Sequence, residues 1–198
     1  IRMRLVGSEM CIRDSITPRK HYKQSYNFPL RRGKWDATEG GIRVPLIIMG
    51  PGIDKTRYSD TPISFSDLLP TIIDIAGNKK LKNSELDGGS FKDLINNESD
   101  SVNRKSKGLF FHVPYENKIA LERAHSAVII DSLKLIKYHD NNELNLYDIK
   151  NDLSESIDLS NIQIKGKLVN IKITRRLEKM LDDYFCLLYT SPSPRDAS

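Results

Sequence analysis

Short apolar runs separated by turn-forming residues make up the first half of the chain. The run Val44–Met49 ends at Gly50-Pro51-Gly52, a pattern typical of a buried strand followed by a turn. Ser66–Gly77 has the pattern of a short helix: Ser66 can cap its first turn, and Gly77 suits a left-handed residue after its last turn. We expect one face of this helix to lie in the core, because its apolar side chains recur at helical spacing: Leu68, Leu69, Ile72, Ile73 and Ala76.

The second half of the chain alternates strand-like runs with short polar turns. Four runs follow one another closely, and the last three can form an antiparallel meander: Leu109–Val113, Ser126–Ile130, Leu133–Tyr138 and Leu144–Ile149. From Ile162 the pattern becomes helical, with a face at buried spacing: Ile173, Leu177, Met180 and Tyr184. The polar stretch 78–103 contains an expected short helix near Phe91–Ile95 and is the expected boundary between two structural units.

Composition places the chain among globular proteins. Its 198 residues suit one domain or one and a half, and 38% hydrophobic with 29% charged residues excludes a disordered or fibrous protein. The longest apolar run, Val44–Met49, is far too short to span a bilayer, so we expect no membrane partner. Residues 1–15 contain no apolar segment of signal-peptide length.

The two ends of the chain match each other at the level of DNA. One DNA sequence that encodes Cys186–Asp196 also encodes Leu5–Asp14 on its opposite strand. Such a match resembles a sequencing-library adapter joined to both ends of a fragment. We therefore interpret residues 1–15 and 186–198 as adapter-derived and expect them to add nothing to the fold. Both cysteines lie in these ends, and residues 16–185 are then a fragment, of metagenomic type, that is open at both ends.

The basic excess lies in one short segment. The net charge of the chain is +5; the two ends contain four arginines and three acids, which leaves residues 16–185 with 27 basic against 23 acidic residues. Residues 16–43 alone carry seven basic against two acidic residues. So local an excess favours an anion site over a nucleic-acid surface, and we expect no nucleic-acid partner. A solvated basic loop is the alternative.

Several motifs of the chain resemble those of one enzyme family. Asn27–Leu46 contains Pro-Leu-Arg-Arg-Gly-Lys and then Glu-Gly-Gly-Ile-Arg-Val-Pro. It resembles the second signature of the type I sulfatases, Pro-Leu-Arg-x-Gly-Lys-Gly followed by Glu-Gly-Gly-x-Arg-x-Pro. Further sulfatase-like motifs follow in the family's order: Gly50-Pro51-Gly52, Asp67–Thr71, Leu86-Asp87-Gly88, Ser126–Val128, Leu133–Ile136, and Leu146–Asp152 with Glu155.

The resemblance implies an α/β fold, the C-terminal part of an alkaline-phosphatase-like sulfatase that ends in a small antiparallel sheet packed against a C-terminal helix. Residues 16–97 would be the last part of the catalytic domain and residues 98–185 the C-terminal subdomain. The family hydrolyses sulfate esters, which implies a sulfated small-molecule or carbohydrate substrate and a periplasmic, secreted or lysosomal location.

The resemblance makes Lys34 the catalytic lysine that reaches the sulfate ester. Attack at sulfur builds negative charge on the sulfuryl oxygens and on the leaving oxygen, and a fixed ammonium stabilises both. Flanking glycines such as Gly33 let the backbone approach the anion closely. His112 stands where sulfatase C-terminal domains often lend a residue to the substrate pocket, with a structural histidine as the alternative.

Other polar residues are expected to be structural. Glu39 and Arg43 bracket Gly40 and Gly41, and we expect them to form an ion pair that holds the loop. Arg31 and Arg32 could steer an anionic substrate, but we expect them to be solvated charges. Three histidines receive no role: His21, His125 and His139.

We expect no metal ligand in this chain. Four polar residues after the last strand-like run could suggest a metal loop: Asp148, Asn151, Asp152 and Glu155. Their spacing does not match the calcium-binding loop, and Asx turns explain them better. Asp14 lies near the place of a family metal ligand, but it belongs to the adapter-like end and is not adopted.

The chain also departs from the family pattern. Trp35 stands where the family has glycine, and Thr38 where tyrosine or phenylalanine is common, which puts the substrate class in doubt. The Cys-x-Pro-Ser-Arg motif that becomes formylglycine is not in the chain, nor are the paired N-terminal aspartates that bind metal.

The leading hypothesis is the C-terminal part of a sulfatase whose formylglycine and divalent cation, calcium, are supplied by a missing N-terminal part, so that this chain alone is inactive. A phosphonate or phosphodiester hydrolase of the same superfamily is one alternative, and a non-catalytic anion- or carbohydrate-binding module is another. A third is that the chain does not fold stably alone and exposes apolar surface at Val44–Met49 and Leu68–Ala76.

Overall fold

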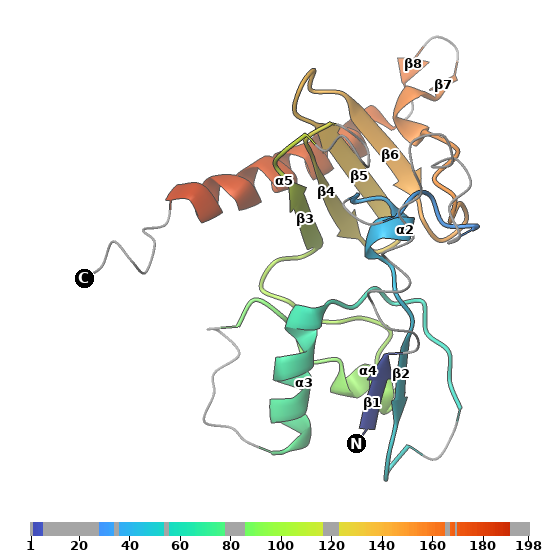
Figure 1. The fold of residues 1–198 in the computed structure, drawn as a ribbon, viewed down its shortest axis with the longest axis vertical. Helices are drawn as coiled ribbons and strands as arrows, with labels where there is room; N and C mark the ends of the chain where they lie inside the picture. The colour runs from blue at the N-terminus through green and yellow to red at the C-terminus, as the bar shows by residue number, and fades with distance from the viewer. Residues whose placement is uncertain are drawn as a thin grey trace. The chain divides into compact units, whose positions relative to one another are not determined.

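The structure, a computed structural model, describes residues 2–5, 28–33, 36–53, 56–77, 86–116, 123–164, 167–168 and 170–190 (Figure 1). These residues belong to two compact units. The first unit comprises Ile1–Glu9 and Val44–Leu109, and the second comprises Met10–Arg43 and Phe110–Ser198. No helix among the described residues is long and apolar enough to cross a membrane.

A two-stranded antiparallel ribbon belongs to the first unit. Strand β1 (Arg2–Leu5) pairs with β2 (Leu46–Met49), with Arg2 opposite Met49 and Leu5 opposite Leu46. The predicted strand is confirmed, but its predicted burial is wrong, because Ile47 is 48% and Met49 57% exposed. The segment Arg2–Leu5 was expected to add nothing to the fold, yet it pairs with β2. An unpaired strand edge can form backbone hydrogen bonds with any extended segment, so this pairing does not require a specific sequence. The adapter origin of this segment stays a prediction.

Helix α3 (Leu68–Ile75) follows a 3-10 turn, η2 (Phe65–Asp67). Ser64, not Ser66, caps the turn: its hydroxyl accepts from the Ser66 amide, and its own amide donates to Asp67 Oδ2 at 2.7 Å. The added turn moves the cap two residues upstream. Gly77 has a φ of +69°, which confirms the left-handed end of the helix.

The apolar face of α3 does not lie in a core, contrary to expectation. Leu69 is 53% and Ile72 49% exposed, whereas the buried residues of the helix are Pro70 and Thr71. Helical spacing identifies which side chains share an apolar face, but it does not show whether another part of the chain packs on that face. The short helix expected near residue 91 is present as α4 (Lys92–Ile95).

The buried carboxylate of Asp67 ties the first unit together. Arg104 donates to both of its oxygens, from Nε to Oδ1 at 2.8 Å and from Nη2 to Oδ2 at 2.7 Å. The Gly89 amide donates to Oδ1 at 2.9 Å. A Cβ at Gly88 would lie 2.0 Å from the Ser66 carbonyl oxygen, so only glycine fits there. The motifs that begin at Asp67 and end at Gly88 are therefore explained by packing.

A four-stranded sheet forms the centre of the second unit, in the order β3-β4-β5-β6. Its strands are Leu109–Val113, His125–Ile130, Leu133–Tyr138 and Leu144–Asp148. Strands β4, β5 and β6 are antiparallel neighbours, with Ala127 opposite Ile136 and Leu135 opposite Leu146. The predicted meander is confirmed.

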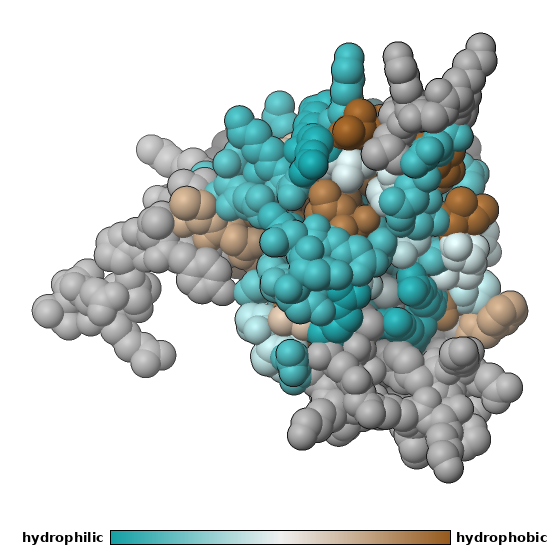
Figure 2. Space-filling model, turned by 90° about the horizontal axis from the view of Figure 1, so that it is seen from above, coloured by the Kyte–Doolittle hydropathy of each residue, from teal (hydrophilic) through white to brown (hydrophobic). Residues whose placement is uncertain are grey.

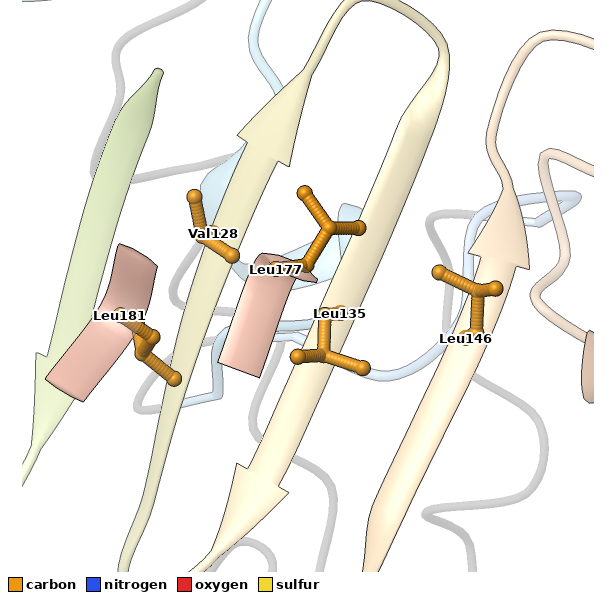
Figure 3. Packing of buried hydrophobic residues seen from close by; sticks show 5 residues of the cluster. All are labelled: Val128, Leu135, Leu146, Leu177 and Leu181. Atoms are coloured by element: carbon orange, nitrogen blue, oxygen red, sulfur yellow. The ribbon is translucent and has the colours of Figure 1, made fainter. Parts of the chain in front are cut away.

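Helix α5 (Ile171–Thr190) packs on one face of this sheet (Figure 1). Its side chains Leu177 and Leu181 point toward the strands, where they meet Val128, Leu135 and Leu146 (Figure 3). The buried face is shifted from the predicted one: Leu181 is 1% exposed, whereas Ile173 is 42% exposed. The helix continues past residue 185 into the expected adapter-derived end.

Smaller elements complete the second unit: the 3-10 turn η4 (Leu159–Asn161) and the hairpin β7 (Gln163–Ile164) and β8 (Lys167–Leu168). In the view of Figure 2, hydrophilic residues surround separate, smaller hydrophobic areas. The two compact units divide the chain at residues 43 and 109, so residues 28–43 belong with the C-terminal sheet. The expected boundary at residue 97 separates the catalytic domain of the complete enzyme from its C-terminal subdomain. That boundary stays a prediction.

Candidate functional site

The signature segment, residues 28–43, is the candidate site. Lys34 and Trp35 lie outside the residues that the structure describes, so the role of Lys34 stays a prediction. Their neighbours Gly33 and Asp36 are buried. The site is therefore described through the two backbone segments on either side of this dipeptide, residues 28–33 and 36–43.

Helix α2 (Glu39–Ile42) lies directly on the loop that carries Lys34. The Gly40 amide donates to the Arg31 carbonyl at 2.8 Å, and a Cβ at Gly40 would lie 2.2 Å from the Arg32 carbonyl oxygen. A Cβ at Gly41 would lie 2.0 Å from the Asp36 oxygen and 2.6 Å from the Gly33 oxygen. Two consecutive glycines are thus required because a helical turn packs against backbone on both sides of Lys34.

Asp36 and His125 fix the loop on the C-terminal side of Lys34. His125 Nε2 accepts from the Ala37 amide at 3.0 Å, and its Nδ1 lies 2.8 Å from the Arg123 carbonyl oxygen. In this arrangement Nδ1 donates to the carbonyl oxygen and Nε2 accepts from the amide. Asp36 Oδ1 accepts from the Thr38 amide at 2.9 Å. His125, which received no role from the sequence, anchors the signature segment to strand β4.

Glu39 is the centre of a buried ionic cluster. Arg43 Nη1 lies 3.3 Å from Glu39 Oε2, the ion pair expected from the sequence. Lys134 of β5 donates from Nζ to Glu39 Oε1 at 3.0 Å and lies 2.8 Å from Glu155 Oε1, in a close ion pair whose angles fall outside hydrogen-bond geometry. Glu155 Oε2 in turn accepts from the Glu39 amide at 2.9 Å.

The cluster is closed to solvent. The side chains of Lys134 and Glu155 are both 0% exposed and that of Glu39 is 3% exposed. Burial raises the pKa of the Glu155 carboxyl, and the neighbouring Lys134 ammonium opposes this shift. We call Glu39, Lys134 and Glu155 the buried triad.

The two arginines that precede Lys34 are held by the protein. Arg31 Nη1 donates to the Tyr147 hydroxyl at 2.9 Å and to the Glu155 carbonyl at 3.2 Å. Arg32, whose φ is +59°, donates to Asp36 Oδ2 at 3.3 Å. The expectation that these residues are solvated charges is therefore wrong, because both donate hydrogen bonds within the protein.

His112 of β3 faces a second polar group. Its Nδ1 lies 2.7 Å from Ser126 Oγ, which lies 2.8 Å from His139 Nε2. The His112 ring also packs against the Phe185 ring, with centroids 4.6 Å apart. Burial, and after it the neighbouring His139, lowers the pKa of His112. These contacts fit the structural alternative for His112, and its substrate role stays a prediction.

Comparison with known proteins identifies the family. Residues 34–183 match the family described as N-sulphoglucosamine sulphohydrolase, C-terminal. The chain belongs to the sulfatase family. A sulfatase of Formosa agariphila is 32% identical over 143 residues, which are 67% of this chain and 25% of the relative. The N-acetylglucosamine-6-sulfatase of Bos taurus is 38% identical over 73 residues, 37% of this chain and 13% of the relative.

The arylsulfatase K of Gallus gallus is 30% identical over 135 residues, 67% of this chain and 24% of the relative. The chain thus spans a quarter or less of the length of these curated sulfatases. A Bacteroides thetaiotaomicron protein assigned to the sulfatases has the same fold, with a TM-score of 0.59 and 22% identity over 85% of this chain and 37% of that chain. The predicted family and fold class are confirmed.

The described part of this sulfatase does not supply a metal site. No group of three or more histidine, cysteine, aspartate or glutamate side chains there could hold an ion. Asp148 instead accepts from the Lys150 amide at 3.2 Å and from Asn151 Nδ2 at 2.7 Å, and Asp152 accepts from the Ile157 amide at 2.8 Å. These carboxylates shape turns, and the residues present do not fit the calcium that the family resemblance implies.

Sequence reasoning missed the partners of the signature segment, although one signal was available. Lys134 interrupts the apolar run Leu133–Ile136, and a lysine at a buried strand position has to be paired. Nothing in the local sequence identifies Glu39 and Glu155 as its partners, because they lie 95 residues before and 21 residues after it in the chain.

Proposed function

We propose that this chain is the C-terminal part of a carbohydrate sulfatase and that Lys34 contacts the sulfate group of its substrate. The complete enzyme would hydrolyse a sulfate ester of a sugar, with formylglycine as nucleophile and a divalent cation, both outside this chain. Relatives that act on sulfated sugars support the substrate class, since one is an N-acetylglucosamine-6-sulfatase. A periplasmic, secreted or lysosomal location belongs to the same proposal.

The observation that carries the proposal is the packing around Lys34. Gly41 contacts the backbone of both Gly33 and Asp36, and His125 holds Ala37, so the residues on each side of the Lys34–Trp35 dipeptide are fixed. Electrostatic stabilisation of a transition state needs a charge that is already in place, because reorganisation of the group would cost part of its effect. The fixed residues on either side would limit the reorganisation of a lysine between them, which supports the proposed role.

The pairing of the neighbouring cations supports Lys34 as the anion ligand. Arg31 bonds Tyr147, Arg32 bonds Asp36, and Arg43 pairs with Glu39. Their charges are partly balanced within the protein. The ammonium of Lys34 would stabilise charge that develops on the sulfuryl oxygens and on the leaving oxygen.

The decisive experiment compares this chain with the complete reading frame that contains residues 16–185. We expect the complete enzyme to release sulfate from N-acetylglucosamine 6-sulfate and the 198-residue chain to release none, with or without calcium. Lys34→Ala in the complete enzyme should lower kcat/KM by about a thousandfold, the scale for one oxyanion-stabilising group. Lys34→Arg serves as the control that keeps the charge.

Three results would overturn the proposal. Turnover by the chain alone would show that the nucleophile lies within it. Hydrolysis of phosphonates or phosphodiesters in preference to sulfate esters would identify the enzyme as a phosphoryl-transfer member of the superfamily. Equal binding of sulfated sugars by the parent chain and by Lys34→Ala would indicate a non-catalytic binding module.

A further inference from the structure

We propose that Lys134 is a positioning residue for the signature segment: it holds Glu39 and Glu155 together beneath helix α2 and thereby fixes the loop on which Lys34 lies. The inference rests on the proposed function of Lys34 and adds a residue 100 positions away in the sequence. Lys134 lies on strand β5, the central part of the sheet that packs against α5.

The contacts form a continuous path from the sheet to the loop. Lys134 Nζ reaches Glu39 Oε1 at 3.0 Å and Glu155 Oε1 at 2.8 Å. Glu155 then accepts from the Glu39 amide, so α2 is held at its first residue by its side chain and by its backbone. Two residues later in the same turn, Gly41 packs on the Gly33 and Asp36 carbonyls.

Charge balance explains why a lysine stands at this position. Two buried carboxylates without a cation between them would repel each other and lack solvent, at a large cost in free energy. With Arg43 beside Glu39, the cluster contains two basic and two acidic side chains. Lys134 is the cation that both carboxylates share.

The small net contribution of buried ion pairs to folding stability favours a role of the buried triad in positioning α2 over a role in stabilising the fold. Replacement of a buried ion pair by apolar side chains of similar volume is often neutral or stabilising, so ion pairs add little net stability there. The hydrogen bonds from Lys134 to Glu39 and from the Glu39 amide to Glu155 are directional, however, and they define the distance and orientation of these groups. The triad connects the sheet to α2, whose glycines touch the backbone beside Lys34.

Three variants of the 198-residue chain test the inference. Lys134→Met removes the shared cation. The triple variant Glu39→Gln/Lys134→Met/Glu155→Gln removes all three charges at similar volume and is expected to fold even where the single variant does not. Leu181→Ala is the matched control, because it destabilises the core between α5 and the sheet without touching the triad.

Two measurements are made on each folded variant, well below its own melting temperature. The first is amide hydrogen exchange at Ala37, Thr38 and Gly41, relative to amides of β4 and β5. The second is the affinity for N-acetylglucosamine 6-sulfate by NMR titration, with N-acetylglucosamine as the blank. In the triple variant we expect about tenfold faster loop exchange and about fivefold weaker binding of the sulfated sugar. Leu181→Ala should leave both ratios within about twofold of the parent chain.

Loop exchange in the triple variant as slow as in the parent chain would overturn the inference. Changes in loop exchange and sugar affinity as large in Leu181→Ala as in the triple variant would also overturn it, because Lys134 would then contribute only to general stability. A chain in which Lys34→Ala binds the sulfated sugar as tightly as the parent would overturn the proposed function instead. In that case the hydrogen exchange still decides whether Lys134 positions the loop.

Discussion

At the scale of single residues, the site is determined by where a Cβ atom can be placed. Gly40 and Gly41 are required because carbonyl oxygens of the loop lie 2.2 Å and 2.0 Å from the positions of their missing Cβ atoms. A methyl group there has to displace backbone, since no flexible side chain can move away. The Glu-Gly-Gly part of the signature is thus a packing requirement.

Gly41→Ala should therefore lower the free energy of unfolding of the second unit by about 3 kcal/mol. Equilibrium denaturation monitored by NMR signals of β4 and β5 measures this loss. Gly77→Asn, followed by NMR signals of α3 in its own unit, is the control, because Gly77 has a φ of +69° and open space around it, and asparagine tolerates that conformation. A loss in Gly41→Ala no larger than in the control would contradict the packing argument.

The two histidines on either side of Ser126 make the second unit sensitive to acid. Burial lowers the pKa of His112 and of His139 from the ordinary value of 6.5; His139 further lowers that of His112, and Lys137 that of His139. The unfolded chain then binds more protons than the folded chain below about pH 6.5, so stability falls as the pH falls through this range. Glu155 acts in the opposite direction, because its pKa is raised from the ordinary value of 4.5 and the folded chain binds the proton more tightly than the unfolded chain.

His112→Gln should reduce the loss of melting temperature that the parent chain shows between about pH 7.5 and about pH 5.5. The glutamine keeps a polar group near Ser126 but removes the titrating ring. Melting curves of both proteins across this range provide the comparison, and NMR titration of His139 reports the remaining ring. Identical pH dependence in the two proteins would show that this pair does not control acid sensitivity.

At the scale of elements, a single carboxylate organises the first unit. Asp67 accepts from Arg104, Gly89 and Ser64, and its carbonyl oxygen accepts from Thr71 Oγ1 at 2.6 Å. It thereby joins η2, α3 and the segment that leads into α4. Its side chain is completely buried, and that of Arg104 is 11% exposed.

Arg104→Met should destabilise the first unit by about 3–5 kcal/mol, because it leaves the Asp67 charge buried without its partner. The double variant Asp67→Asn/Arg104→Met should recover a large part of the loss. Arg57→Met is the control, since its partner Asp100 is 88% exposed and such pairs contribute at most about 1 kcal/mol. Urea unfolding of the three proteins decides the matter; a double variant as unstable as the single one would contradict a charge-based explanation.

Elements were predicted well where a local pattern determines them. The alternation and turn residues of 125–148 predict the β4-β5-β6 meander, and the left-handed Gly77 marks the end of α3. Long-range partners could not be predicted in the same way. Lys134 with Glu39, and His125 with Ala37, are joined by tertiary packing, and a single sequence contains no record of such contacts.

At the scale of the whole molecule, the first unit exposes apolar surface. Phe65, Leu69 and Ile72 are each 49–53% exposed, and Met49 of β2 is 57% exposed. Exposed apolar surface of this kind promotes association between molecules. These side chains lie in the two segments, Val44–Met49 and Leu68–Ala76, that we expect to be exposed if the chain does not fold stably alone, and that hypothesis stays a prediction.

Leu69→Lys/Ile72→Lys should therefore reduce self-association at high protein concentration and change the free energy of unfolding by no more than about 0.5 kcal/mol. Light scattering over a concentration series measures the association. Ile171→Lys/Ile173→Lys on α5 is the matched control, because it removes two apolar side chains that are 46% and 42% exposed elsewhere. Equal reductions in both variants would show that net charge, and not the α3 face, controls association.

The close contact of Gly41 with the loop backbone also bears on what a Glu-Gly-Gly motif in a sulfatase sequence says about the evolution of that sequence. Selection for folding alone would preserve this glycine, because any side chain there would collide with backbone. A descendant that had lost its nucleophile and become a pseudoenzyme would still need glycine at this position of the motif in order to fold. The motif therefore traces common ancestry, and the residues that form the nucleophile are the ones that separate working hydrolases from inactive descendants.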